Sequence, residues 1–91
     1  MPFTGIRQTL VRFEDRLKLR RRMLRRLGVR LPRHLTPQEQ ETVRETIIRC
    51  VNCDHTGACS AWLNREDAPA EPPAYCPNRD IFEAMMKADA R

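Results

Sequence analysis

Four cysteines are the residues of this sequence whose spacing defines a chemistry most sharply. Cys50, Cys53 and Cys59 fall within ten positions, and Cys76 follows after a gap of sixteen residues. Cys50 and Cys53 belong at a junction between a helix and a turn, where two thiols can face one ion. Four thiolates around one ion form a closed structural site. We therefore expect these four cysteines to bind one metal centre together.

The spacing favours an iron–sulfur cluster over zinc. Zinc sites made of four cysteines usually contain two C-x2-C pairs, and the second pair is missing here. Three cysteines in one short loop, with a remote fourth that a proline follows, are typical of iron–sulfur ligation, so we favour a 4Fe–4S cluster. Zinc is the alternative cofactor, and a thiol–disulfide redox protein is a third interpretation. His55 is a further candidate ligand, but we expect it to be a solvated turn residue.

Charge is divided unevenly along the chain. Residues 1–34 carry eleven Lys and Arg against Glu14 and Asp15, which gives +9, whereas residues 35–91 carry six against ten Asp and Glu, which gives −4. A basic arm beside an acidic body predicts that residues 12–33 contact nucleic acid, an anionic membrane surface or an acidic protein. The alternative is a helix whose arginines only solvate its outer face. The arginines expected to bind the anionic partner are Arg20, Arg21, Arg22, Arg25 and Arg26.

The basic arm has the apolar period of a long amphipathic helix over residues 4–27. Apolar residues recur every three or four positions and form a seam, which consists of Phe3, Ile6, Leu10, Phe13, Leu17, Leu24 and Leu27. Arg20 alone interrupts this seam, and we expect it to face an acid of the body, such as Glu41 or Glu45, or the edge of a partner helix. Gly28 is placed to end the helix.

Three further helices are predicted after this arm. Thr36, Pro37 and Glu39 form the signature of a capped helix start, and the helix that follows delivers Cys50 near its end. A short helix is expected over residues 58–64, a proline-rich loop over residues 65–74, and a last helix capped by Asn78. The predicted fold is therefore all-α: three or four helices form a small bundle around the four-cysteine site, and the long basic N-terminal helix lies alongside. We divide the chain into a helical arm, 1–34, and a metal-binding domain, 35–91.

Enzymatic activity is the least supported class of function. The sequence has no nucleophile and base in a recognisable context, no glycine-rich phosphate loop and no isolated carboxylate pair, so we expect no catalysis and no small-molecule substrate. It also has no secretory signal and no apolar stretch of about 20 residues, which predicts a cytoplasmic protein with reduced thiols. The leading expectation is a non-catalytic metal-binding module, redox- or iron-responsive, that contacts its partner through the arm. The alternative is a structural interaction protein that zinc stabilises.

The segments around the cysteines also resemble a known family. "RCVNC", the later cysteine with "AWL", and "PPAYCPN" before "IF" are similar to a family of small, uncharacterised bacterial proteins classed as a domain of unknown function. The resemblance covers roughly residues 23–85, and the basic residues before Met23 look less typical of it. It implies a shared fold and a shared metal, with all four cysteines, Trp62 and Asn78 in the pattern, and it implies no known activity.

Overall fold

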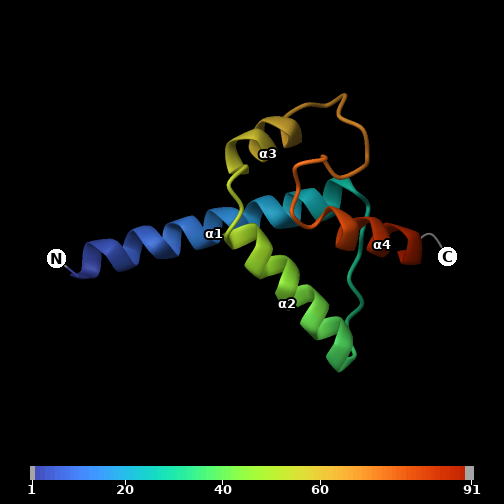
Figure 1. Cartoon of the computed structure of the whole chain (residues 1–91), viewed down its shortest axis with the longest axis horizontal. Coiled ribbons are helices and arrows are strands. Elements are labelled where there is room, and N and C mark those ends of the chain that lie inside the picture. The colour runs from blue at the N-terminus through green and yellow to red at the C-terminus, as the bar shows by residue number, and fades with distance from the viewer. Residues whose placement is uncertain (1, 90–91) are drawn as a thin grey trace.

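Helices make up most of the chain. The computed structural model describes the backbone of residues 2–89 and the side chains of residues 7–88. Within that backbone there are four helices and no strand: α1 (Pro2–Arg26), α2 (Pro37–Val51), α3 (Thr56–Leu63) and α4 (Arg79–Asp89) (Figure 1). The prediction of an all-α fold is confirmed. None of these helices combines the length and the apolar character that crossing a membrane requires.

The longest helix, α1, contacts both helices that carry cysteines. Helix α1 packs against α2 and α3, and in Figure 1 these two leave it in different directions while α4 lies near its C-terminal end. The N-terminal half of α1 projects away from the other helices, and the side chains of residues 7–15 are exposed, including Leu10 at 56% and Phe13 at 40%. The predicted apolar seam is therefore covered only in its C-terminal half. The side chains of Phe3 and Ile6 lie outside the described residues.

The hydrophobic core is small and joins the C-terminal part of α1 to α4. Met23 and Leu24 of α1, with Leu27 and Val29 after it, pack against Phe82 of α4, whose side chain is completely buried. Partly buried side chains surround this cluster, among them Cys59, Trp62, Cys76, Met85 and Met86. The core thus uses residues on both sides of the boundary expected between 34 and 35, and the division into an arm and a domain stays a prediction.

Local sequence signals set the C-terminal end of α1 and the start of α2. Gly28 adopts a φ of 73°, its N–H bonds to the carbonyl of Arg25, and the N–H of Val29 bonds to the carbonyl of Leu24. This pattern is the Schellman motif, in which a left-handed residue satisfies the last carbonyls of a helix. At the start of α2, the Thr36 hydroxyl accepts from the N–H of Glu39, whose carboxylate accepts from the N–H of Thr36, so the predicted capping box is confirmed.

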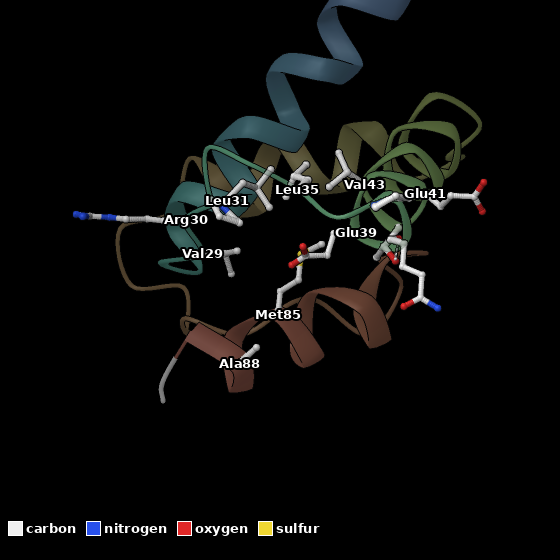
Figure 2. A pocket seen from close by; sticks show the side chains of 13 residues that line it. Val29, Arg30, Leu31, Leu35, Glu39, Glu41, Val43, Met85 and Ala88 are labelled. Carbon is white, nitrogen blue, oxygen red and sulfur yellow. Dashed lines mark hydrogen bonds between the residues drawn. The ribbon is translucent and has the colours of Figure 1, made fainter.

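An open groove of about 1000 Å³ separates the start of α2 from α4. Figure 2 shows Met85 and Ala88 of α4 facing Val29 and Leu35 across this groove, while the side chain of Arg30 points away from it. The remaining lining comes from the connecting segment and the first half of α2: Leu31, Pro32, Pro37, Gln38, Glu39, Glu41, Thr42 and Val43. The groove is thus made mainly of apolar side chains, and the carboxylate of Glu39 within it serves the capping box.

Replacing Gly28 with Ala is expected to lower the free energy of unfolding by about 1 kcal/mol, because an L-residue at this positive φ is strained. No atom lies within 4 Å of an added Cβ, so the loss is conformational and not a clash. Urea unfolding followed by circular dichroism measures it. Gly57→Ala is the matched control, since that position in α3 is equally open and has an ordinary φ. The control should be neutral or gain about 0.5 kcal/mol, and equal stability of both variants would contradict the left-handed turn.

Candidate metal centre

All four cysteines line one small cavity beside α1. Cys50 comes from the last turn of α2, Cys53 from the turn that follows, Cys59 from α3, and Cys76 from the turn before α4. The cavity holds about 30 Å³, and its wall is completed by α1 residues and by neighbours of the cysteines: Arg16, Leu19, Arg20, Met23, Thr56, Tyr75, Pro77 and Phe82. The structure therefore brings together the four residues that the spacing selects.

Backbone hydrogen bonds between residues close in the sequence form the turns that place the thiols at the cavity. The N–H of Cys53 bonds to the carbonyl of Cys50, so the chain turns back immediately after α2. The N–H of Cys59 bonds to the carbonyl of His55 as α3 begins, which sets that cysteine in the first turns of the helix. The N–H of Cys76 bonds to the carbonyl of Pro73, and this turn returns the long loop to the cavity. Three separate turns thus supply the four thiols.

The thiols share a cavity, but in this conformation they are not arranged as a set of ligands. Among the described side chains, no group of three or more His, Cys, Asp or Glu is positioned to hold a metal ion. The four cysteines are half-buried free thiols without a disulfide. Two of the sulfurs accept hydrogen bonds instead: that of Cys50 from Nδ2 of Asn78 at 3.2 Å, and that of Cys53 from the N–H of His55 at 3.3 Å. Ligation would require these side chains to rotate toward a common point.

Burial disfavours the ionised form of three of the thiols, those of Cys50, Cys59 and Cys76. Desolvation, followed by the negative charge of neighbouring cysteines, raises the pKa of Cys50 to about 11 and that of Cys59 to about 11. Desolvation also raises the pKa of Cys76. A metal cation binds only thiolates, so it must displace these protons as it enters. Burial thus opposes ionisation of these three thiols until a cation supplies compensating charge.

Arg20 is buried behind the cysteines instead of lying on the basic surface. Its side chain is only 8% exposed, Nε donates to Oγ1 of Thr46 at 2.9 Å, and Nη2 has no partner within the described residues. The expectation that Arg20 binds an external anionic partner is wrong, because α2 covers it. No ion pair among the described residues joins Arg20 to Glu41 or Glu45; Arg20 instead meets the hydroxyl of Thr46 on the neighbouring α2, and Glu45 pairs with Arg49. Desolvation lowers the pKa of Arg20.

Asn78 links the cysteines to the buried threonine. Its side chain is completely buried, and Nδ2 donates to the carbonyl of Thr46 at 2.9 Å as well as to the sulfur of Cys50. Its Oδ1 accepts no hydrogen bond in the described part of the chain, so the side chain does not cap α4 as the sequence suggests. The sequence does not predict this link, because Thr46 looks like an ordinary polar residue of a helix. The "YCPN" segment is the one signal that places Asn78 near a cysteine.

Three more arginines of α1 end on the polar groups at the C-terminal ends of α2 and α3. Arg16 donates to the carbonyl of Val51, the last residue of α2. Arg22 donates to Oδ1 of Asn64, the residue that follows α3, at 2.8 Å. Arg26 donates to the carbonyls of Leu63 and Arg65 and stacks over the ring of Trp62. The last carbonyls of a helix lack partners within it and carry partial negative charge, which favours these contacts.

Arg21 and Arg25 remain available to an external partner. Both side chains are exposed, and neither makes a hydrogen bond or an ion pair to another described residue. With Lys18, which is also exposed, they follow one another at steps of three and four residues and so lie on one face of α1. This set, Lys18, Arg21 and Arg25, is called the exposed basic ridge below. Of the five arginines expected to bind a partner, these two keep a free side chain.

His55 lies at the mouth of the cysteine turn and is exposed. Its ring is 5.4 Å from that of Tyr75, in a tilted arrangement. Desolvation and the neighbouring cysteines raise the pKa of Tyr75. The exposure of His55 agrees with the expectation that it is a solvated turn residue. Its backbone N–H donates a hydrogen bond to the sulfur of Cys53.

A small all-α protein with four cysteines around one cavity is the class that fold and site define. Residues 7–88 match a family described as a family of unknown function (DUF6455), and the chain belongs to that family. The match extends well before Met23, so most of α1 is part of the family's domain and not an appended segment. No curated protein and no solved structure matches the chain.

Replacing Asn78 with Ala is expected to lower the free energy of unfolding by about 2 kcal/mol, because it removes a completely buried side chain and its hydrogen bonds to the carbonyl of Thr46 and the sulfur of Cys50. Chemical unfolding at equilibrium measures the change. Asn64→Ala is the matched control: its side chain is also bonded, to Arg22, but it is exposed, and we expect a change within about 0.5 kcal/mol. Similar losses in the two variants would show that the buried network around Thr46 has no special role.

Proposed function

We propose that this protein is a non-catalytic metal-binding module whose centre is held by Cys50, Cys53, Cys59 and Cys76. The observation that carries the proposal is their convergence on one small cavity from three separate turns. Thiolates are soft ligands that select zinc and iron–sulfur clusters over harder cations. The proposal requires side-chain rotation toward the centre, since the thiols are not yet positioned as ligands.

An iron–sulfur cluster is the leading cofactor of this proposal, on the strength of the cysteine spacing and the proline after Cys76. When bound, such a cluster would supply one-electron chemistry or a response to iron supply, and the protein's own groups would tune it through the hydrogen bonds to sulfur from Asn78 and His55. A redox- or iron-responsive role follows from that chemistry.

Zinc is the second candidate, and the volume of the cavity favours it. About 30 Å³ accommodates little more than a water-sized sphere before any side chain moves. A single ion fits that space, whereas a four-iron cluster needs the cysteines to move apart. With zinc the module is structural, because four thiolates complete its coordination and leave no catalytic position.

We further propose that the exposed basic ridge, Lys18, Arg21 and Arg25, contacts an anionic partner such as nucleic acid, an anionic membrane surface or an acidic protein. The support is the freedom of these side chains, in contrast to the buried Arg20 and the bonded Arg22. Three positive charges on one helical face create a local positive potential that attracts an anionic surface. The contact would therefore be electrostatic and sensitive to salt.

Metal analysis of anaerobically purified protein is the direct test of the centre. We expect either iron with acid-labile sulfide, together with a brown colour, or about one zinc per chain without colour. Finding neither, with four titratable thiols and an intact helical spectrum, would contradict the proposal.

Cys76→Ser separates a metal centre from four unrelated thiols. We expect it to lower the metal content strongly and to destabilise much of residues 45–80, because it detaches the long loop from the centre. The control is the chelator-treated wild type, which should melt near the variant. A melting temperature within about one or two degrees of the untreated protein would show that the helices do not depend on the centre.

The double variant Arg21→Gln, Arg25→Gln is expected to weaken polyanion binding without changing the melting temperature. Wild-type affinity for duplex DNA, RNA or anionic vesicles should fall steeply between about 50 and 200 mM salt, because bound counterions are released. The matched pair Arg22→Gln, Arg26→Gln removes the same charge but also the contacts to α3, so it should lower the melting temperature. No binding by the wild type at low salt would mean that the exposed basic ridge only solvates α1.

A further inference from the structure

The guanidinium of Arg20 is a buried charge without a carboxylate. Its bonded partner is the neutral hydroxyl of Thr46, and that hydroxyl donates a hydrogen bond to the carbonyl of Val43. Nη2 is shielded from solvent and has no partner in the described structure. A buried cation that lacks a counter-charge is strongly destabilising, so a fold that retains one needs a nearby anion. The described ion pairs join Arg49 to Glu45, Arg65 to Asp67 and Arg79 to Glu83, and none includes Arg20.

The cysteine cavity lies next to Arg20 and contains groups that become negatively charged when they bind a metal. Arg20 lines this cavity together with all four cysteines. The cysteines are free thiols here, and an uncharged thiol gives Arg20 no counter-charge. Four thiolates around Zn²⁺ or around a 4Fe–4S core, by contrast, carry more negative charge than the metal neutralises. The unpartnered nitrogen and the negative centre therefore complement each other.

We propose that Arg20 is the internal counter-ion of the cysteine-held metal centre and thereby ties α1 to the loaded site. The inference rests on the proposed metal centre and adds a positioning residue to it. Arg20 belongs to α1, whereas the cysteines belong to α2, α3 and the connecting turns, so the pairing joins the two parts of the molecule. It also accounts for an arginine in a seam of apolar residues. Loading of the centre strengthens the packing of α1, and loss of the metal leaves a buried charge that weakens it.

The test compares Arg20→Leu, Arg20→Lys and the control Arg21→Leu, with zinc alone as the probe and with the metal found in the native protein. Arg20→Leu should weaken metal binding, measured by competition with a chelator, about tenfold or more, as is typical when a group that supports metal ligands is removed. Arg21→Leu removes the same formal charge from the exposed surface and should change the affinity less than twofold. Arg20→Lys keeps the charge and should restore part of the affinity.

Melting temperatures provide a readout that a purely structural role would not produce. In the loaded protein Arg20→Leu should melt below the wild type, and in the metal-free protein it should melt above the wild type, because the substitution removes an unpaired buried charge. A lower melting temperature in both states, or an unchanged affinity, would overturn the inference while leaving the metal centre intact. A wild type that binds no metal would remove both proposals. If Arg20→Leu does not fold, the affinity of Arg20→Lys relative to Arg21→Leu decides the question.

Discussion

The packing of α1 depends on arginine side chains that donate hydrogen bonds to polar groups at the C-terminal ends of other helices. The core proper is a single cluster around Phe82, too small to fix the angles of three further helices. Arg16 reaches the last carbonyl of α2, and Arg26 reaches the last carbonyl of α3 and one beyond it. The end of α2 leads into the cysteine turn and Arg16 itself lines the cavity, so this contact also helps to fix the cavity wall. Unsatisfied carbonyls are strong acceptors, and the planar guanidinium meets more than one of them at a time.

Much of the fold was predictable because it is encoded by neighbours in the chain. The capping box at Thr36 and the left-handed turn at Gly28 depend on residues within a few positions, and both are found as expected. The first helix was expected over residues 4–27 and spans 2–26, and the short helix expected over 58–64 spans 56–63. The prolines between α3 and α4 prevent a helix there, as the composition indicates. The convergence of the cysteines was also anticipated, since their spacing constrains a turn.

The rest could not be read from the sequence because it depends on which helical faces meet. A helical wheel places Leu10 and Phe13 on the same seam as Leu24, but only the C-terminal half of α1 has neighbours to cover it. Charge counting treats every arginine alike, whereas packing buries Arg20 and leaves Arg21 in solvent. The sequence alone does not distinguish an arginine that is bonded to a carbonyl from one that is solvated. The bonds of Asn78 and Thr46 likewise join α2 to the segment before α4, across about 30 residues.

The location of Phe82 in the core has a consequence for the order in which the protein acquires its structure during translation. Leu24 and Leu27 leave the ribosome early, but the aromatic ring that they pack against is made about 55 residues later. Until then α1 is a nascent amphipathic helix with an uncovered apolar stripe. The cysteines that will line the cavity beside it are synthesised one after another. Folding is therefore completed only after α4 has emerged, and nascent chains that stop short of Phe82 present an open seam to chaperones and proteases.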